Sequence, residues 1–248
     1  MFDFEIKIAQ SQEEIKAAQL LRYSVFHLEA QELNPNGNQK YDCDAYDAIS
    51  RHLIVLDKSN NNKVVGTYRL LFSSDAGSLG YHCEKIFNIA NIKKLSGTLL
   101  ELGRSCIDKE YRNTAVINLL WNGIAWQIKE NNVKYIFGCP RLDQMSRQEI
   151  NEAFALIREK YYAAEELRVY PLPGNSYDGL DQAVRCENFR KTFRNLSALV
   201  KGYLHLGALV CGEPAVNPEF GSIVFFMLLP TEKIASPYKR HFLGNNNT

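Results

Sequence analysis

The chain has 248 residues, with 29 Lys and Arg against 28 Asp and Glu, and 46% of its residues are hydrophobic. This composition is that of a packed globular protein, and a net charge of +1 provides no overall field that would attract nucleic acid. Met1–Glu5 shows no secretion signal, and the longest apolar run, Ile223–Leu229, is too short to span a bilayer. We therefore expect a cytoplasmic protein that binds no nucleic acid.

The first half of the chain predicts strands around one helix. Alternating apolar residues over 4–8 indicate a strand, and Ser11–Glu14 forms a capping box that opens a helix to about Leu28. A long polar loop is expected over 34–47, because Asn, Gly and Asp dominate it. Further strands are expected at 52–57, 64–72 and 99–106, and the buried face of the first helix is expected to be Ile15, Ala18, Leu21, Val25 and Leu28.

The second half predicts more helix. Helical spacing runs over 113–130, a strand follows at 134–139, and a second capping box at Ser146 opens the next helix. A final buried strand is expected over 222–229. The prediction is one α/β domain over 1–248, with a mixed, mostly antiparallel sheet and helices on both faces. Its helical insertion, after Phe137-Gly138-Cys139, covers 141–205, and a tail covers 231–248.

The cysteines and histidines show no metal-binding or disulfide pattern. No CxxC pair occurs, so reduced thiols and no metal site are expected. Cys106 and Cys139 are interpreted as buried small hydrophobes, because no His suggests a base for a nucleophilic thiol. The residues concerned are Cys43, Cys83, Cys106, Cys139, Cys186 and Cys211, with His27, His52, His82, His205 and His241.

Several charged residues fall in or beside predicted elements that should be buried. Alternation along the strand at 99–106 puts Glu101, Gly103 and Ser105 on one face and Leu102, Arg104 and Cys106 on the other. Each charge taken singly is a common surface pair or solvated turn. Taken together they indicate a site, because buried charges must be paired. The other charges available for pairing are Arg22, Arg69, Asp42, Asp44 and Asp47.

The turn before the long helix has features of a phosphate site. Arg112, Asn113, Thr114 and Ala115 precede or begin that helix, and N–H groups at a helix N-terminus bind phosphate. The pattern is similar to the pyrophosphate turn of GNAT acetyltransferases. Ile117 replaces the last small residue, which predicts a looser cradle than a coenzyme A enzyme uses.

The order of these motifs resembles the GNAT-superfamily autoinducer (acyl-homoserine lactone) synthases. It resembles even more the ornithine lipid (lyso-ornithine lipid) N-acyltransferases, which are often grouped with sequences labelled hemolysins. The resemblance covers most of 15–230. Its motifs are Leu21-Arg22 with Val25-Phe26, Tyr46-Asp47, Gly66 with Arg69-Leu70-Leu71, Glu101-Leu102-Gly103-Arg104, Leu120-Trp121 with Gly123-Ile124, Leu199–Ala208, Cys211–Ala215 and Glu219–Ser222.

Two positions depart from these families. Val224 stands where the ornithine lipid enzymes usually carry an Asp, which puts ornithine as the acceptor in question. The autoinducer synthases usually have a Trp soon after the Val-Phe motif, whereas Leu33 lies in that region here. The second departure counts against the autoinducer branch.

The resemblance implies transfer of a (3-hydroxy)fatty acyl group from acyl carrier protein to the α-amine of an amino acid such as ornithine, in lipid biosynthesis. The donor is a phosphopantetheine thioester or acyl-CoA, used as a co-substrate with no bound cofactor. Glu101 is the hypothesised base, and N–H groups from Glu101 to Gly103 would stabilise the oxyanion. Arg22, Arg69 and Arg104 would order the acidic loop, whose Asp42, Asp44 and Asp47 would also contact a cationic acceptor.

The donor and its carrier should meet further residues. Phe26, Leu102, Gly103, Ser105, Arg112, Asn113, Thr114, Ala115, Trp121 and Phe137 are the candidates for the acyl chain and phosphopantetheine, and Phe72 and Phe87 are further aromatic candidates. For the aromatic residues a core position is the alternative. Lys85, Lys93, Lys94, Lys109, Arg141 and Arg147 are the supply for a carrier-binding patch, and Tyr238–Leu243 suits a peripheral membrane contact.

Three other functions remain open. An autoinducer-type synthase would use S-adenosylmethionine and release a lactone. An ordinary acetyltransferase would use acetyl-CoA and a small amine. A non-catalytic lipid-binding module could keep the same fold, since fold alone does not determine function.

Overall fold

A computed structural model of the chain describes residues 2–29, 40–112, 114–142 and 145–234. In this part, the chain forms two compact units, residues 2–80 with 98–133 and residues 81–97 with 134–234. We call them the first and the second unit. The expectation of a single domain over 1–248 stays a prediction.

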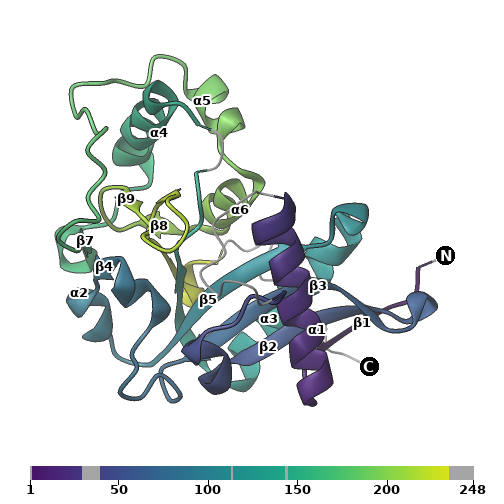
Figure 1. The fold of residues 1–248 in the computed structure, drawn as a ribbon. Coiled ribbons are helices and arrows are strands. Elements are labelled where there is room, and N and C mark those ends of the chain that lie inside the picture. The colour runs from purple at the N-terminus through teal and green to yellow at the C-terminus, as the bar shows by residue number, and fades with distance from the viewer. Residues whose placement is uncertain (1, 30–39, 113, 143–144, 235–248) are drawn as a thin grey trace. The chain divides into compact units, whose positions relative to one another are not determined.

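In its described part, the first unit has four strands that pair antiparallel in the order β1-β2-β3-β5 (Figure 1). Each strand lies where the sequence predicts one. In the β2–β3 connection, the side chain of Asp57 accepts a hydrogen bond from the N–H of Ser59. The bounds are β1 Phe4–Ile8, β2 Arg51–Asp57, β3 Lys63–Phe72 and β5 Thr98–Ile107, with the short helix η3 at Lys58–Asn60.

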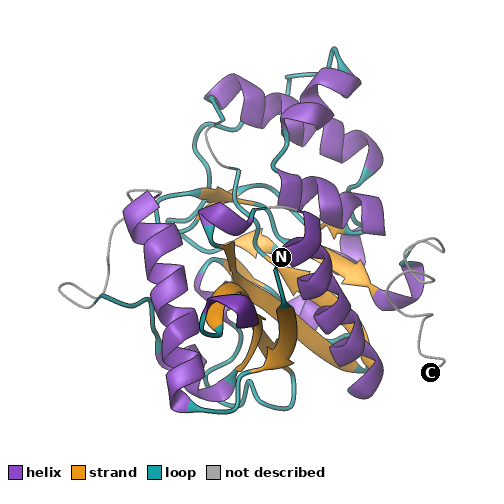
Figure 2. Ribbon diagram, turned by 90° about the vertical axis from the view of Figure 1, so that its right-hand side faces the viewer, coloured by secondary structure: helices purple, strands orange, loops and turns teal. Residues whose placement is uncertain are grey.

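The helices α1 (Gln12–Tyr23) and α3 (Thr114–Glu130) cover opposite faces of these strands (Figure 2). α1 packs on Ile54, which pairs with Thr67 across β2 and β3. α3 packs on Gly66, the residue next to Thr67. Because successive strand residues point to opposite faces, the two helices must lie on opposite sides.

α3 approaches β1 and β2 closely at Gly123. A Cβ at Gly123 would lie 2.6 Å from Ile6 Cδ1 and 2.7 Å from Leu53 Cδ1, closer than real Cβ atoms come. We expect Gly123→Val to lower the free energy of unfolding by about 1–3 kcal/mol through overpacking, as measured by urea denaturation. Gly202→Val is the matched control, because no described atom outside the backbone of its own helix lies within 4 Å of a Cβ there. An equal loss in both variants would contradict this prediction.

α1 continues into a single π-turn, η1 (Ser24–Glu29). A π-turn has a wider spacing than an α-helix, so the 3.6-residue period that predicts a buried Leu28 no longer holds. Leu28 is 61% exposed, whereas Arg22 and His27 are buried. The predicted burial of Leu28 is therefore wrong, and polar side chains point inward instead.

The second unit combines helices with short strands (Figure 1). As predicted, α4 begins after Ser146, whose hydroxyl accepts a hydrogen bond from the N–H of Glu149. The elements in chain order are η4 His82–Lys85, β4 Phe87–Asn88, α2 Ala90–Lys93, β6 Val133–Gly138, α4 Arg147–Lys160, η6 Glu165–Leu167, β7 Tyr170–Pro171, α5 Phe189–Asn195, α6 Ala198–Leu206, β8 Leu209–Val210, β9 Ala215–Val216, β10 Ile223–Val224, β11 Met227–Pro230 and η7 Thr231–Lys233.

The final strand predicted over 222–229 is divided in two. β10 pairs with β9, whereas β11 pairs with β6 and β8. Between β10 and β11, the N–H of Phe225 donates to the carbonyl of Pro140, and the carbonyl of Phe226 accepts from the N–H of Cys211. Within the apolar run, Val224–Leu229 are buried as expected, whereas Ile223 is half-buried. The prediction of one continuous strand is wrong, because the two halves pair with different strands.

The strands within each unit pair antiparallel, and helices lie on both faces of the first unit's strands. The predicted mixed α/β class with a mostly antiparallel sheet is therefore confirmed. Among the described residues, no helix has the length and apolar character needed to cross a membrane. The tail segment 238–243, a candidate for a peripheral membrane contact, lies outside the described residues.

Candidate active site

Arg22 is the buried centre of a network of charged side chains in the first unit. Its Nε donates to Asp42 Oδ1 at 2.7 Å, and its Nη1 and Nη2 donate to the two carboxylate oxygens of Asp47 at 2.7 and 3.0 Å. Burial alone would lower the pKa of Arg22, but the hydrogen bonds and charges of Asp47 and Asp42 raise it above its ordinary value. The guanidinium therefore stays charged although it is fully buried.

Asp44 and Asp47 shape the segment that carries them. The side chain of Asp44 accepts a hydrogen bond from the N–H of Tyr46 at 2.9 Å, and Asp47 reaches back to the N–H of Asp44 at 2.8 Å. This reciprocal capping begins the 3-10 helix η2 (Ala45–Ile49). The prediction of a polar loop over 34–47 is wrong over 45–47, because this capping forms a 3-10 helix there. Residues 34–39 lie outside the described residues.

The carboxyl of Asp47 depends on its cationic neighbours. Burial alone would raise its pKa, but the hydrogen bonds and charge of Arg22, with the charge of Arg69, hold the pKa of Asp47 well below its usual range. A carboxyl whose pKa is lower in the folded state stabilises the protein above the unfolded pKa of about 3.9 and loses this contribution as the pH falls.

We therefore expect the free energy of unfolding to decrease below about pH 5, and to decrease less in Asp47→Asn. The asparagine variant has no carboxyl at this position to take up a proton, so its stability should be lower at pH 7 but flatter towards low pH. Urea unfolding at stepped pH measures both curves. Parallel curves for the two proteins would show that Asp47 does not titrate in this way.

Arg104 lies at a β-bulge in β5. Thr67 pairs with Cys106 and Arg69 pairs with Gly103, so β5 has one residue more than β3 between these pairs. Arg104 has a φ of 50°, in the left-handed region that non-glycine residues rarely occupy. The extra residue shifts the faces, and Cys106 rather than Ser105 shares the face of Glu101. The prediction that successive side chains of this strand alternate between its two faces is therefore wrong beyond Gly103.

Arg104, at the bulge, and Arg69 both reach Asp44. Arg69 Nη1 donates to Asp44 Oδ1 at 2.6 Å, and Arg104 Nη2 donates to Asp44 Oδ2 at 3.1 Å. Arg104 Nε also donates to Asp42 Oδ1 at 3.1 Å. With Arg22, three guanidinium groups thus face three carboxylates in this described network. The expected pairing is confirmed, whereas a contact of the acids with a cationic acceptor stays a prediction.

Two histidines border the same network. His27 Nε2 lies 3.5 Å from Asp42 Oδ2, and His52 Nε2 lies 3.7 Å from Asp47 Oδ1. Burial lowers the pKa of His52. At neutral pH this favours a neutral ring packed beside the ion pairs.

Glu101 lies on the same face of the strands as Arg69. It pairs with Leu71, two residues beyond Arg69 on β3, and its side chain is buried. At Gly103, by contrast, no atom of the described residues apart from its chain neighbours lies within 4 Å of a Cβ built on the backbone. A carboxylate beside open backbone and a bulge is an arrangement that can supply a base and N–H donors. These roles stay predictions.

Arg112, in the turn expected to bind phosphate, already donates hydrogen bonds to other groups of the protein. Arg112 Nη2 donates to Glu29 Oε2 at 2.5 Å, and Arg112 Nε donates to the carbonyl of Ile107 at 3.1 Å. Ala115 is exposed in the first turn of α3. Asn113 and the side chain of Thr114 lie outside the described residues. A phosphate would therefore have to compete with Glu29 for Arg112.

The apolar candidates for the acyl chain divide into two groups. Leu102, Phe72, Phe87 and Phe137 are buried, and Phe137 stacks against Phe226 with 5.5 Å between ring centroids. The three phenylalanines have the core position that the sequence left as the alternative for the aromatic residues. In the first unit, Phe26 and Trp121 are partly exposed, as is Ser105. Contact of these three with a donor stays a prediction.

Two buried thiols are unsuited to nucleophilic catalysis. All six cysteines lie within the described residues, and none of them forms a disulfide there. Burial raises the pKa of Cys106 far above its ordinary value and that of Cys211 to about 12. Both groups are therefore protonated at neutral pH, and a protonated thiol is a poor nucleophile.

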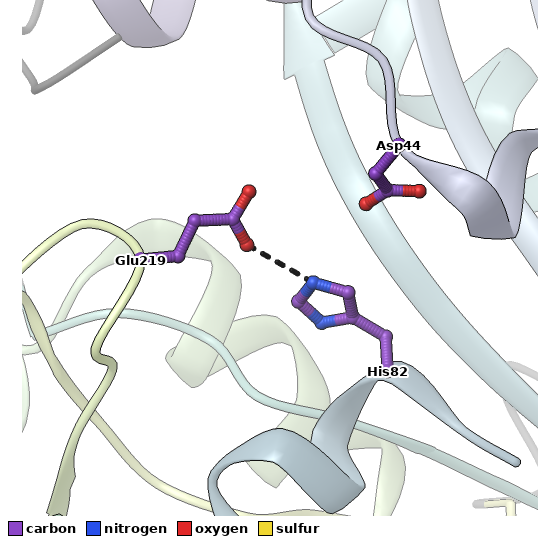
Figure 3. A group of neighbouring side chains, drawn as sticks. All are labelled: Asp44, His82 and Glu219. Carbon is purple, nitrogen blue, oxygen red and sulfur yellow. Dashed lines mark hydrogen bonds and ion pairs between the residues drawn. The ribbon is translucent and has the colours of Figure 1, made fainter. Parts of the chain in front are cut away.

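The sequence interpretation missed a histidine–carboxylate pair in the second unit. His82 Nε2 lies 3.1 Å from Glu219 Oε2, and the dashed line in Figure 3 marks this hydrogen bond. The two residues are 137 positions apart. No spacing motif connects residues so distant, so only the folded chain could show the pair.

Comparison with known proteins identifies the same class of enzyme that the sequence motifs indicate. Residues 21–122 match the family described as acetyltransferase (GNAT) domain. The chain is 32% identical over 250 residues to the L-ornithine N(alpha)-acyltransferase of Rhizobium meliloti (strain 1021), with 97% of this chain and 84% of the relative covered. It is 30% identical over 253 residues to the L-ornithine N(alpha)-acyltransferase of Brucella abortus (strain 2308), with 98% and 90% covered.

Solved structures agree at the level of the fold. The acyl-homoserine lactone synthase LasI has a TM-score of 0.55 at 10% identity, over 100% of this chain and 98% of that chain. The fold and the matches define a GNAT-type N-acyltransferase enzyme. More narrowly, the chain belongs to the family of the L-ornithine N(alpha)-acyltransferases.

Proposed function

We propose that this enzyme transfers a (3-hydroxy)fatty acyl group from acyl carrier protein to the α-amine of ornithine, as a step of lipid biosynthesis. The supporting observation is the identity of 30–32% to relatives named for ornithine acylation, over nearly the whole of this chain. The distant likeness to LasI concerns the fold, so it does not favour a lactone product.

A carrier-protein donor is supported by the turn before α3. Ile117 stands where a pyrophosphate cradle has a small residue, and Arg112 is bound to Glu29. A phosphopantetheine arm needs fewer phosphate contacts than coenzyme A, so a looser turn suits it.

Two of the basic residues proposed for carrier docking already contact other groups of the protein. Lys93 pairs with Glu84, and Arg147 donates to the carbonyl of Gly179. Lys85, Lys94, Lys109 and Arg141 complete the proposed supply.

The reaction forms a C–N bond and breaks the thioester C–S bond, whose electron pair leaves with the sulfur. An α-amino group with a pKa of about 8 is partly neutral at cell pH, so a modest base is sufficient. In the proposed mechanism, Glu101 takes a proton from the attacking nitrogen and delivers it to the thiolate. N–H groups from Glu101 to Gly103, next to the Arg104 bulge, stabilise the oxyanion, and the Arg22 network holds the segment 42–47.

The choice of acceptor is the part of the proposal that needs the most direct test. Val224, which replaces an Asp usual in the ornithine lipid enzymes, is fully buried and pairs with Ala215. This chain therefore has no carboxylate at position 224 that could bind the side chain of ornithine. Asp42, Asp44 and Asp47 are bound by arginines, which supports a positioning role for them.

The deciding experiment supplies the purified enzyme with 3-hydroxypalmitoyl carrier protein and a pool of amino acids and amines, with products identified by mass spectrometry. N-(3-hydroxypalmitoyl) ornithine as the main product is the expected result. Another single N-acyl amino acid would keep the acyl transfer and overturn the acceptor. Acetyl transfer from acetyl-CoA, with no product from the carrier, would overturn the donor. Lactone formed only with S-adenosylmethionine would favour the autoinducer alternative.

A further inference from the structure

One segment of the second unit concentrates positive charge. Residues 184–206 carry five Lys or Arg side chains and a single acid, Glu187, which gives the segment a charge of +4. Because the whole chain has a net charge of +1, all the other residues together carry −3. The segment therefore has a local field that the overall composition hides. The five cations are Arg185, Arg190, Lys191, Arg194 and Lys201.

Contacts around the ring of Phe193 join three helices of the second unit, α4, α5 and α6 (Figure 1). The centroid of this ring lies 6.3 Å from that of Tyr161, which follows α4, and 5.2 Å from that of His205 on α6. Lys201 Nζ, also on α6, donates to the carbonyl of Arg194 on α5 at 2.9 Å. The charge that lies apart along the sequence is therefore gathered where these helices meet.

Two arginines of α5 are available to a partner from outside. Arg190 and Arg194 are exposed and one helical turn apart, and neither guanidinium forms a hydrogen bond or ion pair with another described residue. Lys191 is partly balanced by an acid. Hydrogen bonds from Ser146 and, to a smaller extent, the charge of Lys191 lower the pKa of Glu149. Arg190 and Arg194 have no such neighbour among the ion pairs of the described residues.

Aromatic rings lie beside these cations. Phe189 and Phe193 are half-buried and stack with 6.0 Å between ring centroids. Lys160 Nζ, at the end of α4, lies 4.2 Å from the centroid of the Phe189 ring. Partly exposed aromatic rings next to Lys and Arg are typical of surfaces that bind at a membrane interface. We call the α5 surface the set Lys160, Phe189, Arg190, Phe193, Arg194 and Lys201.

An anionic membrane suits this surface better than an acidic protein does. A specific protein interface depletes charged residues from its core and fixes those that remain against particular partners. No contact within the described residues fixes the guanidinium groups of Arg190 and Arg194. A layer of lipid headgroups is dense and mobile, so it binds such side chains without a fixed geometry. The proposed product also carries an acyl chain, which gives the enzyme a reason to work beside a membrane.

We propose that the α5 surface binds anionic lipid headgroups and holds the enzyme at a membrane surface; the choice of a membrane rests in part on the proposed acyl transfer. The cations contact the headgroups, and the edges of the Phe189 and Phe193 rings reach the boundary of the acyl chains. Each Lys or Arg near an anionic surface raises the affinity roughly fivefold. Several such cations together therefore give reversible binding.

The test mixes the full-length protein with vesicles of phosphatidylglycerol and phosphatidylcholine in equal parts, and measures bound protein by flotation. We expect binding to these vesicles, and roughly 20-fold weaker binding to vesicles of phosphatidylcholine alone. Added salt should weaken the binding, because exposed charges are screened. No acyl donor or acceptor is present, so a failure of the proposed acyl transfer would show only in a separate assay with soluble substrates.

Arg190→Gln/Arg194→Gln removes two exposed charges and is expected to lower the affinity for the mixed vesicles by roughly 25-fold. The kcat with soluble carrier protein and amino acid should stay unchanged. Lys58→Gln/Lys129→Gln is the matched control, because it removes two exposed cations of the first unit and the same total charge. This control should bind the vesicles as the wild type does. Circular dichroism checks that each variant folds.

Phe189→Ala tests the contribution of the rings at unchanged charge. It should lower the affinity for the mixed vesicles by about fivefold, because a half-buried ring loses its contact with the acyl-chain boundary. A folded Phe189→Ala protein with wild-type affinity would remove the rings from the proposed contact. If Phe189→Ala does not fold, the arginine pair decides, since its side chains make no contact that the described fold needs.

Three results would overturn the proposal. The first is wild-type protein that binds neither kind of vesicle. The second is equal vesicle binding by Arg190→Gln/Arg194→Gln and its lysine control. The third is unchanged vesicle binding by the arginine variant together with a higher KM for the carrier protein, which would assign the α5 surface to an acidic protein instead of a membrane.

Discussion

Arg22→Met is expected to lower the free energy of unfolding by about 3–5 kcal/mol, because it leaves the carboxylates of Asp42 and Asp47 without their main counter-charge. Arg22 is fully buried and Asp42 is 1% exposed. Water therefore cannot replace the lost hydrogen bonds. Urea denaturation at pH 7 measures the loss, and a fall in Tm should accompany it.

Arg112→Met is the matched control for Arg22→Met. Arg112 also binds a carboxylate, that of Glu29, but its side chain is 48% exposed. Surface pairs are worth about 0–1 kcal/mol, so the control should lose no more than that. The loss of stability in Arg22→Lys should lie between those of Arg22→Met and Arg112→Met. An ammonium group keeps the charge, but it cannot donate to two carboxylates with the geometry of a guanidinium. Equal losses at Arg22 and Arg112 would contradict the assigned role of burial.

Glu101→Gln is expected to lower kcat by about 10²–10⁴-fold, because the amide is nearly the same size but cannot accept the proton from the attacking nitrogen. Binding of the acyl carrier protein donor should remain measurable, since the substitution leaves the backbone at Gly103 and the bulge at Arg104 in place. Single-turnover rates and donor titrations measure the two quantities separately.

Glu130→Gln provides the matched control for Glu101→Gln, because Glu130 is an exposed glutamate at the end of α3 in the same unit. It should keep the wild-type kcat. Full activity of Glu101→Gln would show that Glu101 is not the base. A large loss in both variants would point instead to a general effect of charge on donor encounter.

The strands and helices of this protein could be predicted because their signals are local. The alternation over 4–8 and the capping boxes at Ser11 and Ser146 involve residues a few positions apart, and β1, α1 and α4 begin where those signals indicate. The same is true of the motif Glu101-Leu102-Gly103-Arg104, which marks β5. Regular geometry follows from hydrogen bonds between near neighbours in a helix and from a period of two in a strand.

The errors occur where that regularity is interrupted. The π-turn at Ser24–Glu29 exposes Leu28 and buries His27, and the bulge at Arg104 moves Ser105 off the face of Glu101. Both irregularities bring polar side chains to Asp42 and Asp44. A periodic pattern contains no signal for an extra residue, because the energy that stabilises it comes from contacts made elsewhere in the chain.

From the residue pattern alone one could read the α/β class, the likeness to acyltransferases and the inventory of charges that had to be paired. The folded chain was needed to show which charge meets which: Arg22 with both Asp42 and Asp47, Arg69 and Arg104 sharing Asp44, and His82 with Glu219. The physical reason is range. Hydrophobic periodicity and helix capping depend on residues a few positions apart. Ion pairs, by contrast, form between any segments that packing brings within about 4 Å.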